Sequence, residues 1–344
     1  MNILVTGGAG FIGFHVAKRL LSDGHRVTIL DNLSNFNSRE LKLARLAELG
    51  IDTARISPGI HLQGPGDLVF IQQDILDRDG LKQVWQAGPV DCVIHLAAVT
   101  GLAPSREQPV FFAENNIQGT VNLLDASRRH GVRHFLFTSS ACVHGCHAHA
   151  PQREEDDVDR PMSIYAMTKR AAELACYSCA YTYRLPVTVM RIFTAFGPWG
   201  RPDSQPMTIA RDIIEGKPIS ICNNGYLIRD FTYVDDIVDG VAIALTNPPI
   251  ASRCNAAYAL YNVGRGKPIP YRTFIQAIET ALGKGATIVE DPASPELQGE
   301  SIESYADTSR LEANLAYSPV WDYEESVPLF VDWFRQHYNK TFRY

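Results

Sequence analysis

Short hydrophobic runs alternate with stretches of helical periodicity over the first two thirds of the chain. Six apolar runs predict buried strands, at 2–6, 26–30, 68–72, 92–96, 134–140 and 187–193. Stretches with apolar positions three and four residues apart predict helices at 11–21, 39–49, 112–130 and 165–183. The Gly- and Pro-rich segment 57–67 predicts a surface loop. This alternation is typical of an α/β fold, a Rossmann-type doubly wound parallel sheet.

The last third of the chain has a different pattern. Prolines at 198, 202, 206 and 218 interrupt it, and helices are expected at 208–215, 271–282 and 324–338. A periodic stretch at 234–245 and an apolar run at 259–263 fit the first part better. We therefore expect two domains with a discontinuous boundary. Residues 1–193 plus about 232–264 form the Rossmann domain, and about 194–231 plus 265–344 form a smaller mixed α/β substrate domain.

A glycine motif follows the first predicted strand. Gly7, Gly10 and Gly13 allow a tight turn, a close approach of the backbone to a pyrophosphate, and close packing of helix on strand. Phe11 and Ile12 begin the next helix, whose N-terminus would direct free N–H groups at phosphates. The second strand ends at Asp31, where a carboxylate binds an adenosine ribose hydroxyl and repels a 2′-phosphate. The order of these features predicts a dinucleotide site for NAD rather than NADP.

Further cofactor contacts are expected at the ends of the next strands. Asp74 and Ile75 follow the third strand and suit the adenine, while Leu96, Ala97 and Ala98 let the backbone pass close to the dinucleotide. Ligands of such sheets bind at the carboxyl ends of the strands. One cleft is therefore predicted to collect these groups.

The candidate chemistry rests on Tyr165 and Lys169, which share one face of a predicted helix. A phenol has a pKa near about 10, and a nearby ammonium and an oxidised nicotinamide favour its ionised form. Tyr165 can then take a proton from a substrate hydroxyl while hydride leaves the same carbon. The strand end with Ser140 and Cys142 is the expected source of a third group. The pair is also common on ordinary helix surfaces, so its place after this strand is what favours catalysis.

Composition excludes several classes of protein. A net charge of −6 gives no reason to expect a nucleic acid or an anionic membrane as partner. The seven cysteines are scattered, which suits a reducing cytoplasm. No apolar run reaches the roughly 20 residues of a membrane span. The first strand begins at once, which leaves no room for a signal peptide.

These motifs resemble the extended short-chain dehydrogenase/reductases, within their nucleotide-sugar epimerase and dehydratase group, and most of all UDP-glucuronate 4-epimerases. The resemblance runs nearly end to end. Its residues are Asp31-Asn32-Leu33, Arg191-Ile192-Phe193-Thr194, Gly197-Pro198-Trp199-Gly200-Arg201-Pro202-Asp203 and Arg229-Asp230-Phe231-Thr232-Tyr233-Val234-Asp235-Asp236.

The resemblance implies a tightly held NAD that is reduced and reoxidised in each turnover, with Tyr165 taking the O4 proton and Lys169 tuning Tyr165. It places Asn32 and Asn116 at the cofactor. It also implies a homodimer built on helices 112–130 and 165–183. Its substrate residues are a diphosphate-binding arginine and two groups for the sugar carboxylate, which here are Arg229, Thr194 and Arg201.

Two positions depart from the family pattern. Cys142 stands where a hydroxyl residue is usual, and Ala103 stands where uronate epimerases have an arginine. A UDP-sugar dehydratase with 4,6- or 5,6-elimination, using Cys142 in proton transfer, therefore stays open. So does a catalytically silent NAD-binding regulatory protein. Several residues of metal-ligand type cluster nearby, but we expect no metal site, because they overlap the active-site strand: Cys142, His144, Cys146, His147 and His149.

Overall fold

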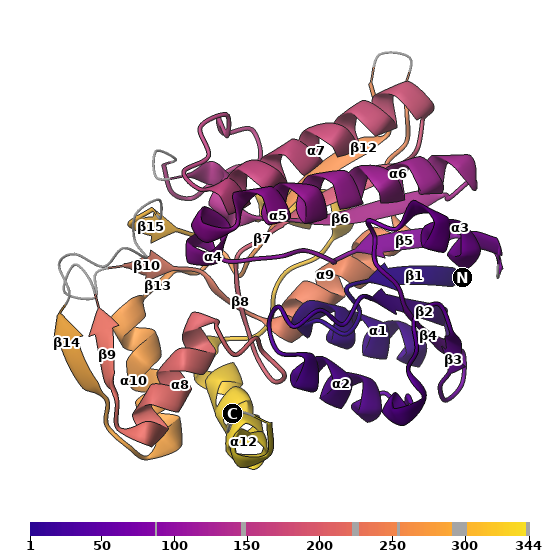
Figure 1. Ribbon diagram of the computed structural model, residues 1–344. Coiled ribbons are helices and arrows are strands. Elements are labelled where there is room, and N and C mark those ends of the chain that lie inside the picture. Colours follow the sequence, from indigo (N-terminus) through magenta and orange to yellow (C-terminus); the bar gives the residue numbers. More distant parts are fainter. Residues whose placement is uncertain (87, 146–148, 222–226, 253–254, 291–300, 342–344) are drawn as a thin grey trace.

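The computed structural model describes residues 1–86, 88–145, 149–221, 227–252, 255–290 and 301–341, with side chains to residue 337. Its centre is a sheet of eight strands in the order β12-β7-β6-β5-β1-β2-β4-β3 (Figure 1). All neighbours pair in parallel except β3 with β4. The strands are β1 (Asn2–Thr6), β2 (Arg26–Asp31), β3 (His61–Gln63), β4 (Leu68–Gln72), β5 (Cys92–His95), β6 (His134–Ser140), β7 (Val187–Ile192) and β12 (Tyr258–Val263). The predicted doubly wound parallel sheet is confirmed.

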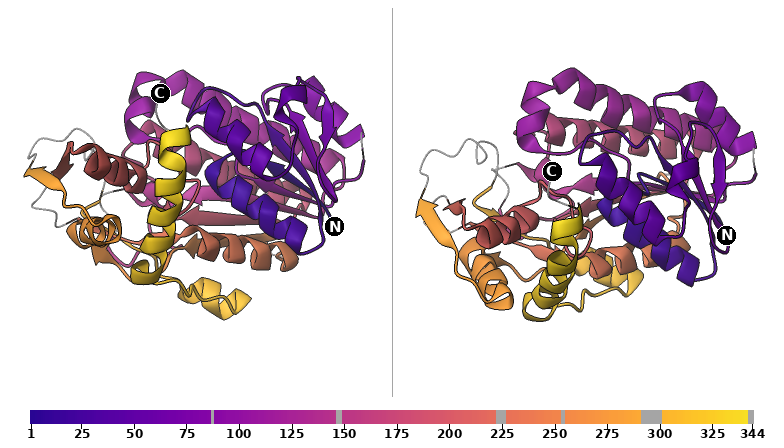
Figure 2. Two further views of the ribbon diagram at one scale, coloured as in Figure 1. Left: turned by 90° about the horizontal axis from the view of Figure 1, so that it is seen from below. Right: turned by 60° about the horizontal axis from the view of Figure 1, so that its bottom comes forward.

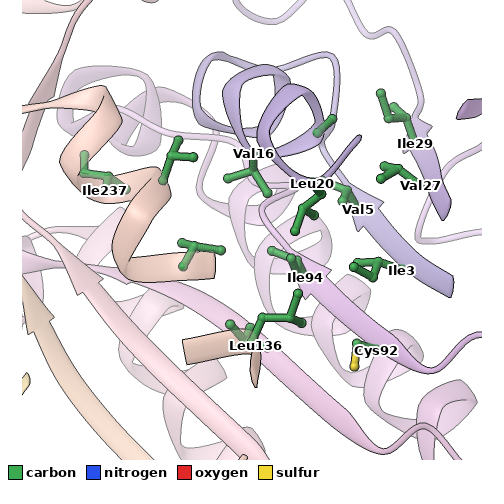
Figure 3. Packing of buried hydrophobic residues seen from close by; sticks show 14 of the residues in the cluster. Ile3, Val5, Val16, Leu20, Val27, Ile29, Cys92, Ile94, Leu136 and Ile237 are labelled. Carbon is green, nitrogen blue, oxygen red and sulfur yellow. The ribbon is translucent and has the colours of Figure 1, made fainter. Parts of the chain in front are cut away.

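The strands are mainly apolar because helices cover both faces of the sheet. Ile3 and Val5 of β1 pack with one hydrophobic cluster, while Leu4 between them packs with another. Figure 3 shows the first cluster, where Val16 and Leu20 meet Ile3, Val5 and Ile94 from the sheet. The period of two along each strand thus gives each face its own core.

Two groups of helices cover these faces (Figures 1 and 2). One face carries α1 (Phe11–Ser22), α2 (Arg39–Glu48), α9 (Val234–Thr246) and α11 (Ser309–Leu315). The other carries α3 (Arg78–Gln86), α5 (Pro109–Ala113), α6 (Gly119–Arg129) and α7 (Ile164–Tyr183), with α4 (Leu102–Glu107) near the start of α5. Within the described residues, no helix has both the length and the apolar character of a membrane span.

The C-terminal part packs on its own cluster of buried aromatic and aliphatic side chains. It contains α8 (Gln205–Glu215), α10 (Tyr271–Leu282) and α12 (Tyr323–Thr341). Its strands are short: β8 (Thr194–Phe196), β9 (Pro218–Ile221), β10 (Ile228–Arg229), β11 (Phe231–Tyr233), β13 (Ile269–Pro270), β14 (Thr287–Glu290) and β15 (Glu303–Ser304). Although α9 and β12 lie in sequence between segments of this part, α9 packs on the main sheet and β12 pairs with β7 in it. The predicted domain boundaries stay a prediction.

Two of the segments predicted from sequence have a different structure. Segment 57–67 is not wholly a loop, because β3 adds an antiparallel edge strand in which buried Leu62 pairs with Phe70. The predicted helix 112–130 begins earlier, at Pro109, and contains a π-helical turn at Glu114–Gln118 before α6. Such a turn inserts one extra residue and rotates the side chains around it, which hydrophobic periodicity does not reveal.

Candidate active site

The loop between β1 and α1 is too tight for side chains. Gly7 has φ +70°, and a Cβ on it would lie 2.6 Å from the backbone nitrogen of Ala97. A Cβ on Gly13 would lie 2.2 Å from the carbonyl oxygen of Gly7. Gly10 caps α1 without a side-chain hydrogen bond. The first N–H groups of the helix therefore face the neighbouring cavity, as a dinucleotide pyrophosphate requires, and the residues present fit NAD.

Asp31 ends β2 in a buried position. Its Oδ1 accepts from the backbone N–H of Leu33 (2.9 Å) and pairs with the Lys42 ammonium of α2 (3.3 Å). Asn32 donates to Oδ2 of Asp74 (2.9 Å), which joins the ends of β2 and β4. These groups follow β2 and β4 at the carboxyl edge of the sheet, beside the point between β1 and β5 at which the strand order reverses and doubly wound sheets bind dinucleotides.

A cavity of about 680 Å³ runs from the glycine loop to the C-terminal part of the chain. It is lined by every predicted site residue except Asn116. These are Gly7, Gly10, Phe11, Ile12, Gly13, Asp31, Asn32, Asp74, Ile75, Leu96, Ala97, Ala98, Ser140, Cys142, Tyr165, Lys169, Thr194, Arg201 and Arg229.

Asn116 lies beside the cavity and hydrogen-bonds residues next to it. Its side-chain oxygen accepts from the N–H of Val99 (2.9 Å), and its nitrogen donates to the carbonyl of Val99 (2.9 Å) and to the hydroxyl of Thr168 (3.0 Å). Asn115 lines the cavity in its place. The π-helical turn explains the exchange, since it changes which of two adjacent residues faces inward.

Tyr165 and Lys169 both line the cavity from the first turns of α7. The helix begins at a capped N-terminus, where Ser163 accepts from the N–H of Ala166 (3.0 Å). Lys169 is buried and donates to the carbonyl of Thr138 on β6 (2.9 Å). Burial lowers the pKa of Lys169 to about 8, so the ammonium persists at neutral pH.

The phenol of Tyr165 lies against the strand end predicted to supply a third group. Burial raises the pKa of Tyr165 above its usual range, and the nearby Cys142 raises it further. The charge of Arg201 and a hydrogen bond with the Ser140 side chain act in the opposite direction and lower that pKa. Ser140 and Cys142 both line the cavity together with Tyr165, so this strand end presents a hydroxyl and a thiol to the site.

His144 completes this wall of the cavity. It is 4% exposed and lies in the 3-10 turn Ala141–His144, with its ring 6.4 Å from that of Phe193. Burial lowers its pKa to about 4, which keeps the ring neutral. Cys146 and His147 of the sequence cluster lie outside the described residues, and among the described residues no three ligand-type side chains come together.

The opposite wall carries the predicted substrate residues. Arg201 donates to the hydroxyl of Thr100 across the cavity and pairs with Asp203 (3.2 Å). Arg229 is 5% exposed and donates to the carbonyls of Ile228 (3.0 Å) and Ile302 (3.1 Å). Two fixed guanidinium groups thus face one cavity, a geometry suited to a ligand that carries phosphates or a carboxylate.

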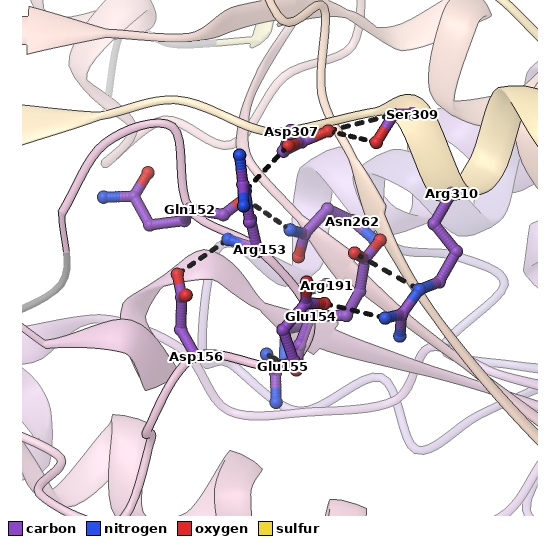
Figure 4. Close-up of polar contacts among 10 residues, drawn as sticks. All are labelled: Gln152, Arg153, Glu154, Glu155, Asp156, Arg191, Asn262, Asp307, Ser309 and Arg310. Carbon is purple, nitrogen blue, oxygen red and sulfur yellow. Dashed lines mark hydrogen bonds and ion pairs between the residues drawn. The ribbon is translucent and has the colours of Figure 1, made fainter.

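The segment before α7 is fixed to this wall by a polar network, drawn in Figure 4. Asn262 of β12 donates to the carbonyl of Gln152 (2.8 Å), and Arg153 donates to Asp307 (3.1 Å). Arg191 of β7 donates to the carbonyl of Glu154 (3.3 Å). Gln152, which lines the cavity, is therefore held in place from three other segments of the chain.

Several lining residues escaped sequence reasoning: Lys42, Arg45, Asn115, His144 and Gln152. Lys42 and Arg45 stand on an amphipathic helix without any motif, and only the three-dimensional arrangement brings them to the site. The one signal was the pair of polar residues Asn115 and Asn116 in an otherwise amphipathic stretch, and it did not distinguish between them.

Comparisons with known proteins agree with this geometry. The model of the NAD dependent epimerase/dehydratase family matches residues 3–264. The probable UDP-glucuronate 4-epimerase of Rhizobium meliloti is 33% identical over 354 residues, covering 99% of both chains. The UDP-glucuronic acid 4-epimerase of Bacillus cereus, solved with UDP-glucuronic acid and NAD, is 30% identical with a TM-score of 0.83, covering 98% of this chain and 99% of that one. DesIV of Streptomyces venezuelae, a dTDP-glucose 4,6-dehydratase, is 25% identical with a TM-score of 0.83, covering 98% of both.

Proposed function

We propose, on the premise that this chain belongs to the NAD dependent epimerase/dehydratase family, that it inverts C4 of UDP-glucuronate to give UDP-galacturonate, reversibly. The observation that carries the proposal is that one cavity collects a dinucleotide cradle, a Tyr–Lys–Ser group and two arginines. The match to UDP-glucuronate 4-epimerases over nearly the whole chain supports this choice of sugar.

In the proposed reaction, Gly7, Gly10, Gly13 and Asp31 would hold NAD, which would supply a reversible hydride acceptor for C4 of the sugar. Tyr165 takes the proton of the O4 hydroxyl as the C4–H bond breaks, and gives it back after the 4-keto sugar has turned. Ser140, which lines the same cavity at the end of β6, holds O4 beside the phenol. Lys169 keeps a positive charge close by, which stabilises the phenolate.

The two arginines orient the substrate in this proposal. Arg229 neutralises the diphosphate, and its hydrogen bonds to two backbone carbonyls fix its direction. Arg201 and Thr194 hold the sugar carboxylate, for which a guanidinium fork is suited. Because Ala103 stands where uronate epimerases have an arginine, Arg201 is the cation that recognises the negative charge of the sugar carboxylate. The predicted cofactor contacts, Asn32 and Asn116 included, remain part of the proposal.

The test is proton NMR of the purified protein mixed separately with UDP-glucuronate, UDP-glucose and UDP-N-acetylglucosamine, without added NAD. A UDP-galacturonate signal that grows to a constant ratio supports the proposal. The variant Tyr165→Phe serves as the control and should leave UDP-glucuronate unchanged while still retaining NAD. Bound NAD without turnover of any sugar would instead favour a catalytically silent binding protein.

A dehydratase is the second candidate, because the thiol of Cys142 lines the same cavity as Tyr165 and Lys169 and DesIV shares the fold. A thiol so placed can carry a proton to or from the carbon next to the ketone. Vinylic protons or a deoxy-keto product in the same NMR experiment would replace the epimerase assignment with this one.

We also propose that the protein is a cytoplasmic homodimer joined through α6 and α7. Large apolar side chains stand exposed on these helices, among them Val121 (40% exposed), Leu174 (51%), Tyr177 (48%) and Tyr181 (56%). Burial of such a face between two copies would remove it from water. Light scattering should give twice the chain mass, and Leu174→Arg should give the single-chain mass with NAD still bound.

A further inference from the structure

The loop that presents Arg201 is held by residues from the opposite part of the molecule. It connects β8 to α8 and passes beside α1 and α2 (Figure 1). His15 of α1 donates from Nε2 to the carbonyl of Pro198 (2.8 Å). Arg45 of α2 donates to the carbonyls of Trp199 (2.6 Å) and Gly200 (3.3 Å). Three consecutive carbonyls are thus bound by side chains from the cofactor side.

Arg45 also holds the glycine-rich loop. Its Nη1 donates to the carbonyl of Ala9 (3.0 Å), a residue that lies between Gly7 and Gly10. The bonds to Trp199 and Gly200 come from Nη2. The side chain is 2% exposed, and it lines the cavity. A single guanidinium fork therefore ties the loop that would surround the pyrophosphate to the loop that carries Arg201. A lysine has one nitrogen and cannot reach both loops with fixed geometry.

The bend in the substrate loop needs such support. Trp199 has φ +61°, a left-handed conformation that is unfavourable for a residue with a Cβ. Its ring packs between Phe14 of α1 (5.5 Å between centroids) and Trp333 of α12 (5.3 Å). Conformations of this kind persist where surrounding contacts determine them. Here those contacts are the ring packing and the hydrogen bonds from Arg45.

We propose that Arg45, assisted by His15, is the positioning residue that fixes the substrate loop to the dinucleotide site and so sets the place of Arg201. The inference rests on the proposed function for the identity of the sugar, but not for the mechanical link itself. Arg45 touches neither reacting atom in this view. Its loss should weaken the binding of the sugar nucleotide and leave the chemistry of Tyr165 intact.

The test compares Arg45→Met and Arg45→Lys with Arg39→Met. Arg39 is the matched control, since it stands on the same helix but donates to the carbonyl of Leu33 on its own side (3.2 Å). Both Arg45 variants should raise KM for UDP-glucuronate by about tenfold or more, because an oriented charged hydrogen bond is lost. The value of kcat should change little, and Arg39→Met should match the wild type.

Hydrogen exchange supplies a readout that needs no turnover. Peptides covering 196–204 should exchange faster in both Arg45 variants than in the wild type or Arg39→Met, with NAD present. If Arg45→Met does not fold, His15→Leu tests the same link through Pro198 and should change the same peptides. Unchanged exchange, or a fall in kcat with KM constant, overturns the proposal. A wild type that leaves UDP-glucuronate unchanged refutes the epimerase but not the link, which exchange still tests.

Discussion

Replacing Arg191 by methionine should destabilise the protein strongly, because it breaks a buried ion pair beneath the catalytic helix. Arg191 of β7 is 1% exposed and Glu173 of α7 is fully buried, with Nε–Oε1 and Nη2–Oε2 distances of 2.9 Å. Glu173 lies one turn beyond Lys169 on the same helix. The two hydrogen bonds between the Arg191 guanidinium and the Glu173 carboxylate therefore fix α7 against the sheet.

The size of the effect follows from what Arg191→Met leaves behind. Removing one partner of a buried pair costs about 3–5 kcal/mol, because the other charge stays buried. Arg170 keeps one contact with Glu173 (3.2 Å), so we expect the lower end, about 3 kcal/mol. With an unfolding entropy of about 2.1 cal/mol/K per residue over 344 residues, this lowers Tm by about 4 °C.

The assay is thermal unfolding by circular dichroism of Arg191→Met, Glu173→Met, the double variant and Arg129→Met. The last breaks an exposed pair with Asp125 (2.9 Å) and should change Tm by about 1 °C or less. The double variant should be more stable than Arg191→Met, since no buried charge is left unpaired. A double variant whose loss of Tm equals the sum of the losses in the two single variants would refute the reasoning. So would a loss of Tm in Arg191→Met no larger than that in Arg129→Met.

Three further results are expected. Gly13→Ala should abolish copurified NAD, measured after acid release, because its Cβ would meet the Gly7 carbonyl, while Gly88→Ala, with nothing within 4 Å, should retain it. Burial lowers the pKa of His134 to about 4 and of His95 to about 3. The unfolded chain therefore binds more protons as pH falls below about 6.5, and each histidine should remove up to about 1.4 kcal/mol of stability per pH unit. A Tm that stays constant from pH 6.5 to about 4.5 would contradict this. Cys142→Thr should keep or raise epimerase kcat, because a hydroxyl is the better donor; a loss of about a hundredfold would assign the thiol a proton.

The sheet could be predicted because each strand is a short apolar run between turn residues. Both faces are covered, so the central residues of β1, β5 and β6 are apolar and the polar ones stand mainly at the strand ends. The short strands that the structure describes in the C-terminal part were not predicted. Strands of two to four residues, such as β8 and β11, have too few positions to show a period, and only pairing between distant segments defines them.

The candidate site was predictable where backbone geometry dictates residue type. Gly7, Gly13 and Asp31 stand in a fixed order on consecutive elements, and Tyr165 and Lys169 share a helix face. Arg45 shows the limit. From sequence it is an ordinary charge on an amphipathic helix, and its role depends on two loops whose carbonyls converge on it from Ala9 and from Trp199.

The parallel pairing of β8 with β11 bears on how the specificity of this fold can be redesigned. Thr194 lies opposite Phe231 in that small ladder, Arg229 stands two residues before Phe231, and Arg201 follows a few residues after β8. Most of the residues proposed to recognise the sugar nucleotide therefore belong to two short segments that hydrogen-bond each other outside the main sheet. A graft that exchanges 194–203 and 228–233 together keeps this ladder and transfers a substrate preference. A graft of either segment alone combines β8 and β11 from two different proteins in one ladder.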